Sequence, residues 1–424
     1  MSEGLWGCKM PRHWRSARLK HICRAVGGGT PDKSNANYWS GDIPWVSPKD
    51  MKSPVIEDTE DRISEEGLRN SAAQMVPPRA VLMVMRSGIL RHAIPVALNK
   101  VPVALNQDMR AFLPDDRIMP EYLVRLIEGH QAQLLREWSK VGATVESLES
   151  ELVGNTLIPL PSRAEQELIV GYVTREAARI DALIAAKERL LDLLSEKRKA
   201  IVSFAVTRGL LPNAPLRSTG VEWNPQAPTH WKALRVGQLF RQSKRLGFSD
   251  LTVLSVYREF GVIERTSRDD NANRVPDDLE KYQLVEVGDL VVNKMKAWQG
   301  SLGISKYRGI TSPDYVVFRP THHEEPEFIH FLLRTQLLTT VYLSMSNGIR
   351  INQWRIEPDR FCGLMVFLPP VMEQREIIQY IVRDTSRLDQ IAHATEQTIG
   401  LLKERRTALI AAAITGQINV GVPA

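Results

Sequence analysis

Two long stretches of the chain carry apolar residues at the three- and four-residue steps of an amphipathic helix. Glycine and proline are absent between Tyr172 and Arg208, and only Gly400 interrupts the second stretch. The pattern predicts two long helices, each with one apolar stripe of the kind that packs in a coiled coil. The stripe residues are Val173, Ile180, Ile184, Leu191, Leu194 and Ile201 in the first helix, and Ile381, Leu388, Ala392, Ile399, Leu402 and Leu409 in the second.

The second stretch repeats the first. Residues 161–207 recur without a gap as residues 369–415, and Glu165-Gln166 in the first copy matches Glu373-Gln374 in the second. A shorter motif with proline, histidine and tryptophan also occurs twice, at 11–14 and 228–231. A solenoid needs about three or more repeats. Two copies indicate instead a pair of large units, each a variable body followed by a constant helix, that contact a partner at two places.

The order of these segments favours an antiparallel helix pair. Each helix of roughly 40 residues is about 60 Å long at 1.5 Å per residue. The second body starts where the first helix ends and leads into the start of the second helix, so antiparallel packing keeps both connections short. The alternative is two ordinary amphipathic helices packed on separate domains.

The same order predicts the domain boundaries. Proline, serine and glycine are frequent between Leu210 and Pro228, which predicts an irregular connector. The expected segments are a first body at 1–158, a first long helix at 159–209, a connector at 210–230, a second body at 231–365, a second long helix at 366–418 and a tail at 419–424. Gly209 and Gly416 are the expected helix ends.

Both bodies read as mixed α/β (α+β) domains with short strands. Short apolar runs such as 80–85 and 94–98 alternate with turn residues in the first body, and 288–293 and 315–318 do so in the second. The glycine triplet at 27–29 lacks the lysine and hydroxyl residue of a phosphate-binding P-loop, so it reads as a plain loop.

Composition narrows the class of protein without deciding it. The chain is 43% hydrophobic and 25% charged, as expected for a folded protein. An excess of 55 basic over 49 acidic residues gives a net charge of +6, and the pI is near 9.1. This balance permits binding to nucleic acid but does not require it.

The three cysteines, Cys8, Cys23 and Cys362, are too far apart to form a metal-binding or redox pair. We therefore expect neither a disulfide framework nor a metal site. The chain lacks an apolar run of about 18 residues and a signal peptide, so we expect a cytoplasmic protein without a membrane span.

Motifs at four places along the chain resemble those of one family. They are 28–31 with 41–46, 293–300 with 312–313, the helix starts at 158–166 and 368–374, and the connector at 218–231. In this order, and with the repeat, they are similar to the DNA-specificity subunit of type I restriction–modification systems over essentially the whole chain. One departure is Gly142-Ala143-Thr144, which lacks the arginine that often follows in the family.

The resemblance implies two target-recognition domains, each reading one half of a split, asymmetric double-stranded DNA site, with the coiled-coil helices as a spacer. It also implies two methyltransferase subunits as partners, and restriction/translocase subunits in the complete host-defence complex. S-adenosylmethionine, ATP and Mg would then bind to those partners, and this chain would carry no cofactor.

The residues agree that the chain is not itself an enzyme. It has no Asn/Asp-Pro-Pro-Tyr/Phe motif for DNA methylation on an amino group and no Gly-x-x-x-x-Gly-Lys-Ser/Thr motif for ATP. We therefore predict no catalytic residues. Two rival hypotheses remain open, a stand-alone site-specific endonuclease and a coiled-coil scaffold that binds only proteins.

Candidate DNA contacts follow from residue type and motif position, since lysine and arginine bind phosphates and amides read base edges. The candidates are Thr30, Lys49, Arg86, Asn106 and Gln107 in the first body, and Lys244, Arg245, Asn293, Lys294, Lys296, Gln299 and Arg350 in the second.

Overall fold

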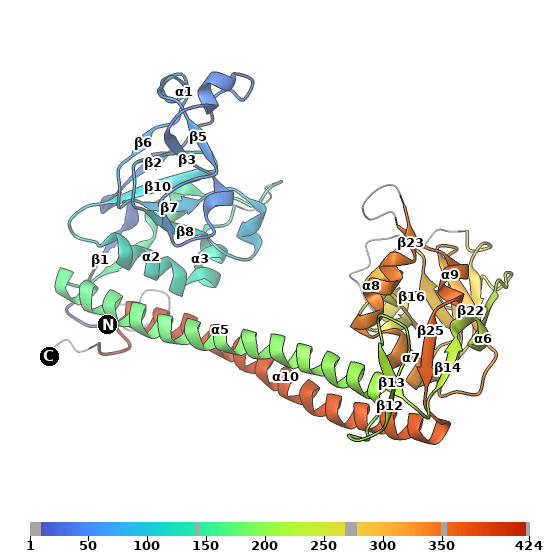
Figure 1. Ribbon diagram of the computed structural model, residues 1–424. Helices are drawn as coiled ribbons and strands as arrows, with labels where there is room; N and C mark the ends of the chain where they lie inside the picture. The colour runs from blue at the N-terminus through green and yellow to red at the C-terminus, as the bar shows by residue number, and fades with distance from the viewer. Residues whose placement is uncertain (1–9, 141, 143, 268–277, 349–353, 421–424) are drawn as a thin grey trace. The chain divides into compact units, whose positions relative to one another are not determined.

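The computed structural model describes residues 10–140, 142, 144–267, 278–348 and 354–420 (Figure 1). The chain divides into two compact units, Met1–Glu188 with Glu396–Ala424, and Arg189–Thr395. Each unit holds one mixed α/β body and one end of each long helix, because α5 (Arg163–Arg208) and α10 (Val371–Ile414) both continue from one unit into the other.

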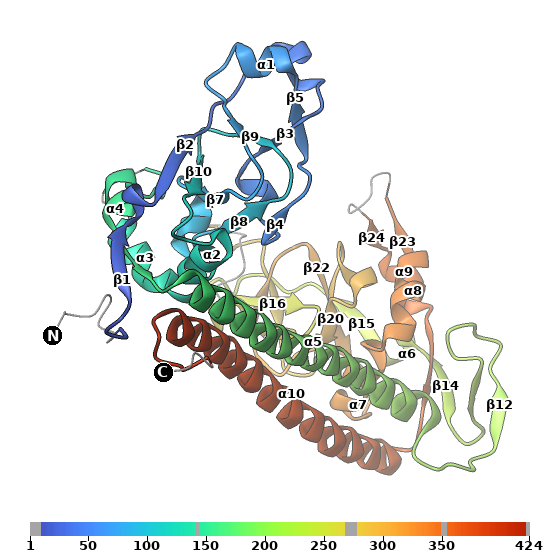
Figure 2. The ribbon, with the colours of Figure 1, turned by 90° about the vertical axis from the view of Figure 1, so that its left-hand side faces the viewer.

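Two sheets and one isolated strand pair form the first body (Figure 2). The five-stranded sheet has the order β2-β10-β7-β8-β4, the four-stranded sheet has the order β5-β3-β9-β6, and β1 pairs with β11. The strands are β1 (Arg15–Arg18), β2 (Cys23–Gly27), β3 (Ile43–Val46), β4 (Val55–Ile56), β5 (Asp61–Ile63), β6 (Met75–Val76), β7 (Val81–Val84), β8 (Val96–Asn99), β9 (Val103–Leu105), β10 (Met109–Pro114) and β11 (Leu157–Leu160).

Short helices surround these sheets. Pro120 begins α2, where its missing N–H costs no helical hydrogen bond, and α2 buries Leu123, Leu126 and Ile127 against the sheet core. The helices are α1 (Glu65–Arg69), α2 (Pro120–Gly129), α3 (Gln131–Trp138) and α4 (Ser150–Asn155), with 3-10 turns η2 (Leu19–His21), η3 (Ala36–Trp39), η4 (Pro48–Asp50) and η5 (Gly88–Arg91).

The second body repeats the central plan with a four-stranded sheet of order β15-β22-β19-β20, and β14 pairs with β25 as β1 pairs with β11. Its strands are β12 (Leu216–Ser218), β13 (Gln226–Pro228), β14 (Lys232–Arg235), β15 (Phe240–Ser243), β16 (Leu254–Tyr257), β17 (Gly261–Glu264), β18 (Gln283–Val285), β19 (Leu290–Asn293), β20 (Leu302–Ile304), β21 (Gly309–Thr311), β22 (Tyr315–Pro320), β23 (Ser346–Asn347), β24 (Arg355–Ile356) and β25 (Met365–Leu368). Its helices are α6 (Val236–Leu239), α7 (Pro326–Leu333), α8 (Gln336–Ser344) and α9 (Pro358–Cys362), with η6 (Arg265–Ser267) and η7 (Ala297–Gln299).

The long helices run antiparallel, as the connectivity predicts. In the first unit Arg406 Nε lies 2.9 Å from Asp181 Oδ1, and in the second unit Arg198 pairs with Asp389. Both ion pairs use residues that the sequence repeat matches, so one interaction occurs twice. The predicted stripe residues Val173, Ile180, Ile184, Leu194, Ile381, Leu388, Ile399 and Leu402 are buried, and Leu191, Ile201, Ala392 and Leu409 are half-buried.

The helix starts and the connector differ from the sequence prediction. Residues 157–160 and 365–368 form β11 and β25, so the helices begin at Arg163 and Val371 and not at 159 and 366. The backbone of these residues is hydrogen-bonded to β1 and β14, which pattern reading within one segment does not reveal. The connector is not irregular, because β12 and β13 pair as a hairpin. Gly209 and Gly416 do follow the helix ends, with φ of 75° and 73°.

The repeated histidine–tryptophan motif binds the start of each long helix. His13 Nε2 lies 2.7 Å from Glu165 Oε1, and Trp14 Nε1 donates to the same oxygen at 3.1 Å. The Ser162 backbone N–H donates to the other carboxylate oxygen at 2.8 Å. The second unit repeats the first two contacts, from His230 at 2.8 Å and from Trp231 at 3.1 Å to Glu373. We call each group of residues the helix clamp.

The first helix clamp perturbs its carboxylate. Burial raises the pKa of Glu165, but hydrogen bonds from His13, Ser162 and Trp14 outweigh burial and bring the pKa down to about 2. The carboxylate is therefore fixed in its charged form.

Among the described residues, no helix combines the length and the low polarity that crossing a bilayer requires.

Candidate nucleic-acid interface

One end of the first five-stranded sheet gathers the candidate contacts. Arg110 of β10 lies opposite Gly27 of β2, and Met109 lies opposite Val84 of β7. Because both pairings are antiparallel, β2 and β7 end, and β10 begins, at the same end of the sheet. We call this end of the sheet the loop end of the first unit. The candidates Thr30, Arg86, Asn106 and Gln107 follow or precede these strands here.

Side chains at this loop end are linked to one another. The Thr30 hydroxyl donates to Gln107 Oε1, and Arg86 Nε donates to Asp108 Oδ1 at 2.8 Å. Arg86 and Gln107 are exposed, so both remain accessible to a ligand. Asn106 is buried, and its Oδ1 accepts from the backbone N–H of Asp108. Asn106 therefore stabilises the loop and does not present its amide to a ligand.

Lys49 leaves the sheet beside the same loop. The Asn106 backbone N–H donates to the Val46 carbonyl at 2.9 Å, and Lys49 follows Val46 in the turn after β3. Its ammonium lies 2.8 Å from Asp61 Oδ2 and 3.2 Å from Glu60 Oε2. Hydrogen bonds to Asp61 and Glu60 raise the pKa of Lys49. The structure thus brings all five first-body candidates to neighbouring turns, with Lys49 already neutralised by carboxylates.

The second unit has an equivalent loop end. Ser243 of β15 lies opposite Val317 of β22, and Asn293 of β19 lies opposite Tyr315. Lys244, Lys294 and Lys296 come directly after these strands, and Lys244 and Lys296 are exposed. The Lys294 ammonium donates to the Pro313 carbonyl at 2.8 Å. Asn293 Oδ1 accepts from the backbone N–H groups of Met295 at 3.0 Å and Lys296 at 3.1 Å, so it closes the turn.

Other second-body candidates lie in different settings. Arg245 Nη2 donates to Asp289 Oδ2 at 2.6 Å, and that carboxylate is almost fully buried. Burial raises the pKa of Asp289, while the Glu286 N–H and the Arg245 guanidinium oppose the rise. Arg245 thus neutralises a core carboxylate. Gln299 is half-buried in η7, and Arg350 lies outside the described residues.

The two loop ends share a backbone frame but not side chains. The backbone N–H of Met85 donates to the Asp108 carbonyl at 2.7 Å, and that of Lys294 donates to the Asp314 carbonyl at 3.1 Å. Strand register makes Met85 the counterpart of Lys294. A buried methionine in one unit is therefore a lysine in the other.

Sequence reasoning missed several residues beside these turns. Arg91 pairs with Glu146 near the first loop end, and Arg355 Nε lies 3.2 Å from Met295 Sδ near the second. Trp298 packs edge-on against Trp354, with ring centroids 5.7 Å apart. Each contact joins residues more than 50 positions apart, so no local pattern could have paired them.

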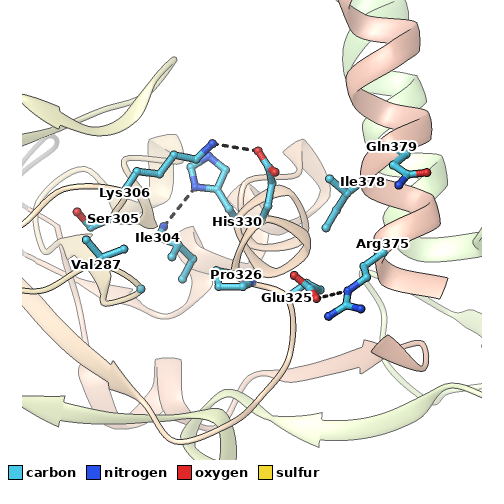
Figure 3. A pocket seen from close by; sticks show the side chains of 12 residues that line it. Val287, Ile304, Ser305, Lys306, Glu325, Pro326, His330, Arg375, Ile378 and Gln379 are labelled. Carbon is cyan, nitrogen blue, oxygen red and sulfur yellow. Dashed lines mark hydrogen bonds and ion pairs between the residues drawn. The ribbon is translucent and has the colours of Figure 1, made fainter. Parts of the chain in front are cut away.

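A cavity of about 420 Å³ lies at the other end of the second sheet, between the turn before β19, the start of α7 and the first turns of α10 (Figure 3). Lys306 Nζ lies 3.0 Å from Glu327 Oε1, and Arg375 Nε donates to Glu325 Oε1 at 2.6 Å. Burial lowers the pKa of His330 to about 3, with Arg334 and Lys306 acting in the same direction. Paired charges and a neutral imidazole make this a packing cavity rather than a polar reaction centre.

The first unit has a smaller cavity of about 260 Å³ at the equivalent place, beside Arg79 and Pro120. Strand register makes Arg79 the counterpart of Gly288, and both have positive φ, 67° and 91°. Arg79 Nη2 lies 2.8 Å from Glu121 Oε1, whereas Glu327, which corresponds to Glu121, pairs with Lys306.

Within the described ranges, no group of three or more histidine, cysteine or acidic side chains could hold a metal ion.

Residues 11–190 match the family described as the type I restriction modification DNA specificity domain. A curated relative, the Escherichia coli type I restriction enzyme EcoR124I/EcoR124II specificity subunit, is 39% identical over 181 residues. That alignment covers 42% of this chain and 44% of the relative, so the chain spans less than half of that relative's length.

Longer matches are more distant. The Salmonella potsdam type I restriction enzyme StySPI specificity subunit is 21% identical over 97% of this chain and 90% of its own length. A solved chain, from work on assembly and conformational transition of the type I R-M system, covers 97% of this chain and 100% of its own. Its TM-score is 0.63 at 17% identity, which supports the fold. Residues 11–190 thus match the type I restriction modification DNA specificity domain, and the chain as a whole is similar to type I restriction enzyme specificity subunits.

Proposed function

We propose that this chain recognises a bipartite, asymmetric double-stranded DNA site and directs the methyltransferase and nuclease/translocase subunits of a type I restriction–modification complex to it. The observation that carries the proposal is the pair of loop ends, which share one backbone frame but present unlike side chains. Two such surfaces on one chain fit two different half-sites.

Each loop end offers the two kinds of contact that DNA recognition needs. Exposed cations such as Arg86, Lys244 and Lys296 suit phosphate oxygens and purine edges, while Gln107 suits an adenine edge. The base-pair patterns of the major groove are distinguishable, so a change of side chain on a constant frame changes the sequence read. The chain supplies recognition, and chemistry belongs to its partners.

The partner surface is proposed from an exposed stripe that the repeat retains. Residues three or four positions apart lie on one helix face. Tyr172, Arg175, Arg179 and Leu183 form such a stripe in the first unit, and Leu183 is 46% exposed. The matching stripe in the second unit is Tyr380, Arg383, Arg387 and Ile391.

Tyr172 and Tyr380 are half-buried and pack against the cores of their units, but the other residues of each stripe are exposed, and their retention in both copies has no explanation in packing. An apolar and aromatic stripe edged by arginines fits an amphipathic partner helix with acidic flanks. Two equal stripes fit two identical methyltransferase subunits. S-adenosylmethionine, ATP and Mg would then be held by partner subunits. The long helices would set the gap between the half-sites.

Methylation sequencing tests the proposal. A host would express the methyltransferase with and without this chain, and long-read sequencing would map methylated adenines. We expect one split, asymmetric motif that is methylated only when the chain is present. An active complex that adds no new motif would contradict the proposal and favour the protein scaffold. Cleavage of DNA by the purified chain alone would favour the endonuclease instead.

A further inference from the structure

The two bodies share a set of cations that their packing does not explain. The segments that follow the repeated Pro-x-His-Trp motif can be aligned directly, residue 11 with 228. Proline, histidine and tryptophan serve the helix clamp, and Leu19 and Val236 are matched core residues. Three further positions hold a cation in both units. They are Arg15 and Lys232, Arg18 and Arg235, and Arg24 and Arg241.

All six side chains are exposed and lie on strand edges. In the first unit Arg15 and Arg18 are the first and last residues of β1, which pairs with β11, and Arg24 lies on β2, an edge strand of the five-stranded sheet. The second unit places its three cations on β14 and on the edge strand β15. We call each triplet the cation strip.

The cation strips are unpaired within the described part of the chain. None of the six side chains forms an ion pair or donates a hydrogen bond to another described residue. Neighbouring cations behave differently, since Arg79 pairs with Glu121 and Arg117 with Asp115. Each strip therefore presents three uncompensated positive charges.

Edge protection explains part of this pattern. Charged side chains on edge strands prevent sheet-to-sheet aggregation. Edge protection requires a charged side chain, but nothing in it requires arginine at the same two positions of both units. Retained sign and retained residue type indicate a ligand that is negatively charged and identical at both units.

We propose that each cation strip binds phosphates of the DNA backbone beside the bases that its loop end reads. This inference rests on the proposed function. Phosphates are the same at both half-sites whatever the sequence, which explains why the strips are retained where the loop ends are not. The exchange of arginine for lysine at positions 15 and 232 suits phosphate, which both side chains bind.

The chain places Arg24 and Arg241, one cation of each strip, within reach of the same duplex as the loop ends. Arg24 precedes Thr30 by one strand, a distance of about 20 Å at roughly 3.3 Å per residue. About six phosphates of one DNA strand span that length. In the second unit β15 leads directly from Arg241 to the exposed Lys244.

The test measures DNA affinity against salt concentration for the complex of this chain with its methyltransferase. The variants are R18Q/R24Q and R235Q/R241Q. The control, R69Q/K100Q, removes equal charge from exposed positions that pair with Glu65 and Glu57. Each phosphate contact contributes about 0.9 to the slope of log affinity against log salt. Each strip variant should lower the slope by about 1.8, equally on DNA with and without the site, with the methylated motif unchanged.

Other outcomes overturn the inference and identify the alternative. A slope equal to that of the control variant excludes phosphate contacts. Loss of the methyltransferase during size-exclusion chromatography, with the slope unchanged, assigns the strips to an acidic protein surface. Aggregation alone assigns them to edge protection. A wild-type complex that binds no DNA defeats the proposed function itself, which separates that failure from failure of the strip.

Discussion

The two units use one scaffold for two surfaces. Each fastens a histidine and a tryptophan to a glutamate at the start of a long helix, and each pairs an arginine with an aspartate between the helices. At the loop ends the resemblance stops, since a buried methionine in one unit corresponds to a lysine in the other. The comparison separates positions held by folding from positions free to vary with the DNA sequence.

The same comparison exposes small asymmetries within the shared scaffold. In the first helix clamp the Ser162 N–H donates to Glu165, but its counterpart Pro370 has no N–H to donate to Glu373. The side chain of Glu165 is 9% exposed and that of Glu373 is 19% exposed. The first clamp therefore holds its carboxylate more firmly.

Substitutions at the loop ends should have the largest effect, which is on selectivity for the DNA sequence. We expect R86A/Q107A to lose selectivity at one half-site only, and K294A with K296A to lose it at the other. Each lost base contact costs roughly 1–3 kcal/mol of discrimination, so wrong bases should be accepted about 5- to 150-fold more often. Methylation sequencing of each variant gives the result directly. If one variant lost selectivity at both half-sites, this would contradict the prediction that each loop end recognises only one of them.

The helix clamps should differ in their contribution to stability. We expect E165A to destabilise the first unit by roughly 2–3 kcal/mol, because three donors lose a charged acceptor that is itself buried. E373A should cost less, because Glu373 accepts from two donors and is more exposed. Hydrogen exchange of β1 with β11, and of β14 with β25, reports each unit separately. If E165A and E373A lost equal protection from hydrogen exchange, this would contradict the predicted difference between the two helix clamps.

Acid should act on the first clamp in a defined range. The folded pKa of Glu165 is about 2, below the ordinary value of 4.5, so its stabilising effect is complete above about pH 4.5. It is lost as pH falls from there toward 2. The difference in exchange protection between the wild-type chain and E165Q should therefore shrink over this range. A difference that grows on acidification would contradict the assignment.

The ion pairs between the long helices should give the smallest effect. Arg198–Asp389 and Asp181–Arg406 are exposed or half-exposed, so each is expected to contribute about 0.2–1 kcal/mol. Double-mutant cycles on unfolding free energy should return similar coupling for both pairs, weaker at high salt. Coupling above about 2 kcal/mol at one pair alone would show that the two ends of the helix pair differ.

Periodic features of the molecule could be predicted from sequence because they are local. The stripes from Val173 to Ile201 and from Ile381 to Leu409 predict the helices, and the repeat predicts their pairing. Non-local features could not. Arg245 reads as a DNA contact until the structure places it on Asp289, 44 residues away. The strand β11 reads as helix until its pairing with β1 is known.

One exchange tests the central claim most directly. A chain in which residues 11–160 replace residues 228–368 keeps both helix clamps, the hairpin connector up to Ala227 and both long helices, but carries the first loop end twice. Long-read methylation sequencing with the partner methyltransferase should then show a split site whose halves are inverted copies of one half of the wild-type site. A wild-type, asymmetric motif from the exchanged chain would contradict the claim that each loop end reads its own half-site.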